Sequence, residues 1–204
     1  MTSAAAAATS SAVRLGEQIF DASEKVNAEF FAISYGALVR QLVDHLPQDD
    51  DVPSVNEQLF AIGHRIGVRL IEEYSVKINS LGNAPAGCRT FAQAAERVAL
   101  TGLRMFLNIK ADLSPVKDSA DTFSIKFQDN PLNLFVELPE GPLREKLWYS
   151  NVLCGVISGA LTLVSFQTKV DYVRDVLRGD SMNEITLRFV GRERDVFQID
   201  KEGK

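Results

Sequence analysis

One stretch of this sequence, residues 147–168, carries no charged side chain over 22 positions. A segment of this length fits either a helix that spans a membrane or a helix that is buried in a protein core. Several of its residues carry hydroxyl or amide groups, for which hydrocarbon offers no hydrogen-bond partner. We therefore favour a buried helix over residues 150–164, in which Gly155 and Gly159 allow a close neighbour. Any membrane contact is then expected to be peripheral.

The composition is that of an ordinary globular protein. The chain has 204 residues, of which 46% are hydrophobic and 24% charged, so one compact domain with a sizeable core is expected. Its net charge of -5 disfavours binding to a nucleic-acid backbone. The two cysteines, Cys88 and Cys154, are too few for a disulfide framework, which indicates a reducing compartment.

Both ends of the chain differ from the middle. Residues 1–22 begin with a run of alanine, serine and threonine, and they predict a disordered tail, because alanine gains little from burial. A transit peptide is the less favoured alternative, since such peptides contain several arginines. Residues 192–204 are charge-rich and predict a second loose tail. The folded domain is expected to span residues 23–191.

Within that domain the hydrophobic period changes along the chain. Apolar residues recur at helical spacing over 23–46, 55–79 and 90–109, which predicts three long helices. The period then changes to two over residues 123–127, and two further strand-like runs at 169–177 and 184–190 predict a hairpin. This order predicts an α+β fold, with a layer of long helices packed on a small twisted antiparallel sheet.

Motifs for catalysis or metal binding are missing from the sequence. The two histidines, His45 and His64, belong to no cluster with metal-ligand spacing. The sequence contains neither a phosphate-binding glycine loop nor a nucleophile elbow. We therefore predict no catalytic residue, no metal site and no enzymatic activity.

Cys88 is the one residue whose surroundings indicate reactivity. It precedes Thr90, a predicted helix cap, so the helix dipole and the neighbouring Arg89 should both favour its thiolate. The plain alternative is a loop cysteine without a role. The helix that follows carries Ala95 and Gly102 on one stripe, where larger side chains would fill a core better. A reactive thiol beside this vacant stripe could carry and bury an acyl chain.

Five blocks of the sequence resemble one known family. The resemblance covers roughly residues 28–190 in unbroken order. On these blocks the chain resembles the palmitoyl-bearing small core subunits of the transport protein particle (TRAPP), a vesicle-tethering complex. The blocks are Ile-Ser-Tyr-Gly-Ala-Leu-Val-Arg-Gln-Leu at 33–42, Ile-Gly-Val-Arg-Leu-Ile-Glu-Glu at 66–73, Asn-Pro-Leu-Asn-Leu-Phe-Val-Glu-Leu-Pro at 130–139, Tyr-Ser-Asn-Val-Leu-Cys-Gly-Val at 149–156, and Gly-Asp before Glu-Ile-Thr-Leu-Arg-Phe at 179–189.

The resemblance implies a site as well as a fold of helices on a twisted antiparallel sheet. It implies that Cys88 is acylated and that the chain, a palmitate-like fatty acyl group, enters an internal tunnel beside Gly102. Helical spacing places Val98 and Met105 one turn to either side of Gly102, and we predict that both line this tunnel. No other cofactor is expected.

The resemblance also implies a cellular role. It implies a non-enzymatic subunit of a complex that tethers vesicles between endoplasmic reticulum and Golgi. The long helices would pair with related small subunits, and an isolated chain could form a homodimer. The assembled complex would act as a nucleotide exchanger for a Rab-type GTPase. The expected location is the cytoplasm, peripheral to Golgi and endoplasmic reticulum membranes.

Two other functions fit the residues. A free lipid carrier or sensor of the same fold would hold an exchangeable hydrophobic ligand and leave the Cys88 thiol unmodified. A thiol enzyme would turn over activated acyl compounds instead of keeping one acyl group.

Overall fold

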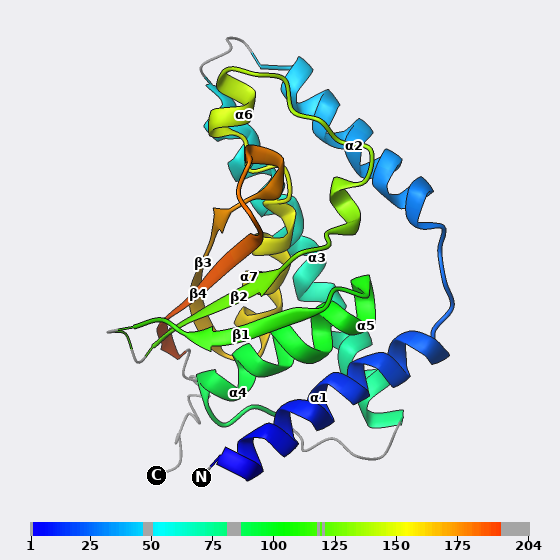
Figure 1. The fold of residues 1–204 in the computed structure, drawn as a ribbon, viewed down its shortest axis with the longest axis vertical. Coiled ribbons are helices and arrows are strands. Elements are labelled where there is room, and N and C mark those ends of the chain that lie inside the picture. Colours follow the sequence, from blue (N-terminus) through cyan, green and yellow to red (C-terminus); the bar gives the residue numbers. More distant parts are fainter. Residues whose placement is uncertain (1, 47–50, 81–86, 118, 120, 193–204) are drawn as a thin grey trace, which may run out of the picture.

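The computed structural model describes residues 2–46, 51–80, 87–117, 119 and 121–192, with side chains from residue 9 onward. Helices lie on a four-stranded antiparallel sheet (Figure 1), which confirms the predicted α+β class. The elements are α1 Thr2–Ala22, α2 Ala28–Asp44, α3 Val52–Ser80, α4 Phe91–Glu96, the π-helix η2 Arg97–Gly102, α5 Leu103–Leu107, β1 Ala111–Pro115, β2 Thr122–Phe127, the 3-10 helix η3 Pro131–Asn133, α6 Pro142–Lys146, α7 Val152–Leu163, β3 Phe166–Arg174, the 3-10 helix η4 Val176–Arg178 and β4 Asn183–Arg192.

The sheet has the strand order β1-β2-β4-β3. Strands β3 and β4 pair as the predicted antiparallel hairpin, and β2 pairs on the other side of β4. Side chains alternate along the strands, so that Ile125, Ile185 and Leu187 are fully buried in the core. Strand β1 at the sheet edge was not predicted, because it is short and ends in Pro115.

Helix α7 confirms the buried-helix interpretation of the uncharged stretch. It packs between α3 and the sheet (Figure 1), and most of its side chains are buried. Its glycines meet those of α3: a Cβ built on Gly155 would lie 2.1 Å from the backbone oxygen of Phe60, and one on Gly63 would lie 2.0 Å from that of Val152. Among the described residues, no helix is long and apolar enough to cross a membrane.

The N-terminal segment differs from the predicted disordered tail over residues 1–22. Residues 2–22 form α1, which packs across η2 and α5 (Figure 1). The alanine run by itself predicts a disordered tail, whereas the second half of the helix supplies Leu15 and Ile19 and a small residue, Gly16, where α1 comes close to Thr101 and Arg104. These residues provide the burial that alanine lacks.

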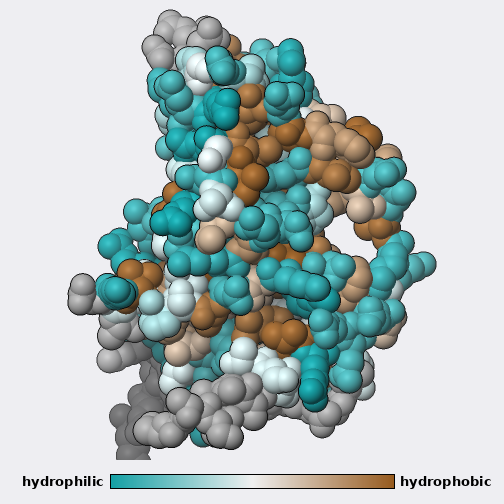
Figure 2. Space-filling model, viewed as in Figure 1, coloured by the Kyte–Doolittle hydropathy of each residue, from teal (hydrophilic) through white to brown (hydrophobic). Residues whose placement is uncertain are grey.

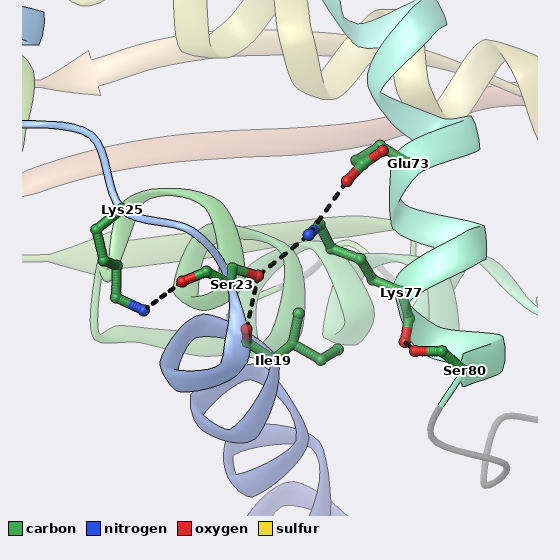
Figure 3. Close-up of polar contacts among 6 residues, drawn as sticks. All are labelled: Ile19, Ser23, Lys25, Glu73, Lys77 and Ser80. Atoms are coloured by element: carbon green, nitrogen blue, oxygen red, sulfur yellow. Dashed lines mark hydrogen bonds and ion pairs between the residues drawn. The ribbon is translucent and has the colours of Figure 1, made fainter.

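The end of α1 is tied to α3 by a short polar chain (Figure 3). Ser23 Oγ donates to Ile19 O at 2.7 Å, and Lys77 Nζ donates to Ser23 Oγ at 3.1 Å. Lys77 Nζ also lies 3.1 Å from Glu73 Oε1. After Ser23 the polypeptide continues to α2 without regular structure.

Helix α2 is shorter than the predicted helix over 23–46. Asn27 caps it, because its side-chain oxygen accepts a hydrogen bond from Phe30 N at 2.7 Å. The buried face carries Ala32, Tyr35 and Val39. The other end of the predicted domain also shifts slightly, since β4 continues to Arg192; the remaining charged tail, 193–204, lies outside the described residues.

Candidate functional site

Cys88 lies in the turn that leads into α4, and it is half-buried against the main core. The predicted cap is confirmed: Thr90 Oγ1 accepts a hydrogen bond from Gln93 N at 3.3 Å, and Gln93 Oε1 accepts one from Arg89 N at 3.0 Å. These bonds fix the backbone that leads from the cysteine into α4. The second cysteine, Cys154, is fully buried in α7.

The electrostatics around Cys88 differ from the sequence prediction. Burial raises the pKa of the Cys88 thiol above its ordinary value, so the thiolate is the minor form at neutral pH. The cation that opposes this effect is Arg97, which hydrogen-bonds the thiol and lowers its pKa. Arg89, the predicted cation, is exposed and is not the group that acts on this pKa.

We expect Arg97→Gln to slow alkylation of Cys88 by iodoacetamide about fivefold at pH 7.5, because one hydrogen bond from a charged donor to the thiolate is lost. Alkylation reports the thiolate, so the midpoint of the rate against pH should move to higher pH in this variant. Arg89→Gln is the matched control and should leave the midpoint in place. An unchanged midpoint in Arg97→Gln would contradict this assignment.

Arg97 begins the π-helical segment that ends at Gly102. The wider helix is marked by the hydrogen bond from Leu103 N to Val98 O, five residues back. Such segments are frequent at functional sites. At Gly102 an added Cβ would meet only Arg97 O, at 3.5 Å, which is ordinary contact. Gly102 therefore has room for a side chain, unlike the glycines between α3 and α7.

The structure does not bring all predicted tunnel residues together. Val98 packs against the main core, beside the same cluster as Cys88. Met105 instead lies in a second cluster of buried residues with Ile19 and Ile78, which we call the satellite cluster. This cluster joins α1, α3 and α5.

The structure has two surface cavities that are not lined by Cys88 or by the predicted tunnel residues. One, of about 410 Å³, lies between α2 and α3 and is lined in part by Leu38, Leu42 and Gln58. The other, of about 460 Å³, lies beside Trp148 and Tyr172.

Sequence reasoning missed Arg97 and Tyr74 as neighbours of the thiol. Both interact electrostatically with Cys88, Tyr74 from the end of α3 and Arg97 from η2. Helical spacing alone could not find them, because they come from separate elements that tertiary packing brings together. In the described part of the chain no three His, Cys, Asp or Glu side chains are placed to hold a metal ion.

An apolar surface on α2 is the second candidate feature. Val26, Phe30 and Ile33 follow one another at helical spacing and have exposed fractions of 81%, 73% and 61%. This stripe lies opposite the buried face of the helix. Figure 2 shows hydrophobic surface over α2 in the upper right of the molecule. Exposed apolar side chains in a row are typical of a binding surface for another protein.

Comparison with known proteins gives consistent matches. A family model described as "Transport protein particle (TRAPP) component" matches residues 31–188. The chain is 42% identical over 174 residues to transport protein particle subunit bet3 of Schizosaccharomyces pombe, covering 85% of this chain and 90% of that protein. It is 37% identical over 175 residues to trafficking protein particle complex subunit BET3 of Saccharomyces cerevisiae, covering 85% and 86%.

A solved structure matches the fold. It is the trafficking protein particle complex subunit 3 from Naegleria fowleri covalently bound to palmitic acid. The TM-score is 0.75 at 39% sequence identity, and the match covers 84% of this chain and all of that one.

Proposed function

Because the chain belongs to the TRAPP component family, we propose that it is a non-enzymatic core subunit of a vesicle-tethering complex in transport between endoplasmic reticulum and Golgi. Its role in this proposal is that of a scaffold. It contributes surfaces to an assembly that acts as a nucleotide exchanger for a Rab-type GTPase. Its place is the cytoplasm, peripheral to Golgi and endoplasmic reticulum membranes.

The observation that carries the scaffold role is the exposed apolar face of α2. Helix α2 is anchored to the body on its other side, where Tyr35 Oη donates to Tyr149 O at 2.5 Å and the two rings meet edge to face. Phe30 and Ile33 are thus presented outward on a fixed helix, with Val26 just before its cap. We propose that related small subunits of the complex dock here, and that a second copy can do so when the chain is isolated.

We further propose that Cys88 accepts a palmitate-like acyl group. Its half-buried position beside the core and the covalently bound palmitic acid of the Naegleria fowleri subunit support this. In the reaction the Cys88 thiolate attacks the carbonyl of an acyl-coenzyme A thioester. A new sulfur–carbon bond forms, the bond to coenzyme A breaks, and the leaving thiolate takes up a proton from water.

The acyl chain is proposed to run past Gly102, with Val98 near its entrance and Met105 further along. Gly102 is suited to this role because an added Cβ would make only one contact within 4 Å, at 3.5 Å from Arg97 O. Each methylene removed from water contributes about 0.8 kcal/mol, so a long chain buried in this way stabilises the folded protein substantially.

Incubation with palmitoyl-coenzyme A tests the lipid site. We expect one acyl increment in the intact mass of the full-length protein, absent from Cys88→Ala and retained in Cys154→Ala. Gly102→Leu should stay folded, since a Cβ at this position makes only an ordinary contact, and should lose most of the palmitoyl increment. Extractable lipid with an unmodified Cys88 would instead support a free lipid carrier. Repeated turnover of the thioester would support a thiol enzyme.

A further inference from the structure

The satellite cluster is small and lies apart from the main core. Its buried members are Ile19 from α1, Ile78 from α3 and Met105 from α5. Leu15 and Phe106 pack against it and are partly buried. The cluster is thus a separate group of packed apolar side chains, covered by one helix from the N-terminal part of the chain.

The satellite cluster begins one helical turn beyond Gly102, because Met105 follows Gly102 by three residues. Tyr74 packs against the satellite cluster and interacts electrostatically with Cys88. Arg97 links the same region to Gly102, because Arg97 hydrogen-bonds the thiol and its backbone oxygen is the atom nearest a Cβ on Gly102. An acyl chain that starts at Cys88 and passes Gly102 therefore meets this cluster next.

Helix α1 is held over the cluster mainly by contacts along its length. Thr101 Oγ1 donates to Ala12 O at 3.1 Å, and Arg104 Nη2 donates to Glu17 Oε1 at 2.9 Å. At its end, Lys77 holds Ser23 (Figure 3). Glu17, Ser23 and Lys77 are at least partly exposed, so water can replace their bonds when the helix shifts.

The main core opens less readily. The helices α3 and α7 meet at glycines, so that backbone touches backbone and neither helix can yield without losing these contacts. Around Met105 the contacts are made by side chains, and methionine adapts its shape easily. Helix α1 does approach its neighbours at Gly16, but less closely, since a Cβ there would lie 2.9 Å from the Arg104 side chain and 3.1 Å from Thr101 O. Of the two clusters, the satellite is the one that can admit a lipid chain by moving one helix.

We infer that the far end of an acyl chain on Cys88 lies in the satellite cluster, with α1 as its removable outer wall. This inference rests on the proposed acylation of Cys88. It assigns lipid contacts to Leu15 and Ile19, which lie before the matched family region of 31–188. The same helix would decide whether the chain end is sealed or open to water.

The test compares two carboxylates placed side by side on α1 in the full-length protein. Ile19→Asp puts a charge into the satellite cluster, and Gln18→Asp puts the same charge on the exposed side. Each is acylated with decanoyl- or palmitoyl-coenzyme A, and Tm is measured against its own unacylated form. In wild type and in Gln18→Asp, palmitoyl should raise Tm by about 10 °C more than decanoyl does. In Ile19→Asp that extra gain should vanish, while the decanoyl gain stays.

An undiminished palmitoyl gain in Ile19→Asp, or an equal loss of the decanoyl gain, would overturn the inference and leave the acylation of Cys88 standing. Absence of acylation in the wild type would overturn the proposed function and the inference with it. A second measurement needs no variant: a palmitoyl chain with a terminal diazirine, attached at Cys88, should cross-link to residues 12–20 or 103–106. Cross-links confined to α7 or the sheet would contradict the assignment.

Discussion

Replacing Gly155 with alanine is expected to destabilise the fold by more than about 3 kcal/mol, and so to lower Tm by about 6 °C or more. The added methyl group would lie 2.1 Å from the backbone oxygen of Phe60 and 2.8 Å from His64 N. Because both obstacles are backbone atoms of α3, no side chain can turn away, and the two helices must separate. The higher helix propensity of alanine, about 1 kcal/mol, offsets only part of this loss.

The same result is expected from the other side of the contact. A Cβ on Gly63 or Gly67 would lie 2.0 or 2.1 Å from a backbone oxygen of α7. Gly102→Ala is the matched control, because it adds the same methyl group to a helical glycine whose nearest neighbour is 3.5 Å away. Thermal and urea denaturation measure the stability of Gly155→Ala and of Gly102→Ala. A Gly155→Ala protein as stable as Gly102→Ala would show that the two helices are not in backbone contact.

This contact shows what the sequence reveals and what it leaves out. The small-residue spacing of Gly155 and Gly159 predicted close approach, and the uncharged stretch predicted burial. The partner was not predictable: Gly63 and Gly67 repeat the same spacing some ninety residues earlier, but the spacing of two glycine pairs does not show that they meet each other. The local sequence pattern indicates that one face of a helix carries small residues, whereas tertiary packing determines which element covers that face.

The same limit explains why helix α1 was not predicted and why the buried face of α2 could not be identified from the sequence. Helical spacing over 23–46 predicted a helix, but it did not separate the exposed stripe of Val26, Phe30 and Ile33 from the second apolar face with Ala32 and Val39, which is the buried one. In α1 large apolar side chains are few, and packing against η2 and α5 stabilises the helix. Periodicity cannot show which of two apolar faces is buried, nor whether a helix will pack well against its neighbours.

At the candidate site, the helix cap beside Cys88 was predictable and the charge around the thiol was not. Cys88 stands before a helix cap that the structure confirms. Its charge environment depends on Arg97, nine positions later, which reaches the thiol because of tertiary packing. The neighbour in sequence, Arg89, points to solvent instead. Electrostatic predictions from adjacency are therefore weaker than predictions of caps, which involve only local geometry.

The second large effect is expected at the α2 surface. The double variant Phe30→Asp/Ile33→Asp should abolish pairing with a related small subunit, lowering affinity by about 1,000-fold. Two apolar side chains with exposed fractions of 73% and 61% are replaced by carboxylates, which would be buried without partners in the interface. The free energy of unfolding of the chain itself should change by only about 0.5 kcal/mol for each substitution, because both residues already face water.

Co-expression with a second small subunit of the family, followed by size-exclusion chromatography, measures this effect. Val76→Asp is the control, since it makes the same kind of change at a site on α3 that is 66% exposed. Complex formation should survive Val76→Asp and fail in the double variant, while both proteins keep the wild-type Tm. Acylation of Cys88 should also persist in the double variant, because Tyr35 and Val39 on the opposite face still hold α2 in place. If the double variant still assembles, the partner docks elsewhere and the exposed stripe has another role.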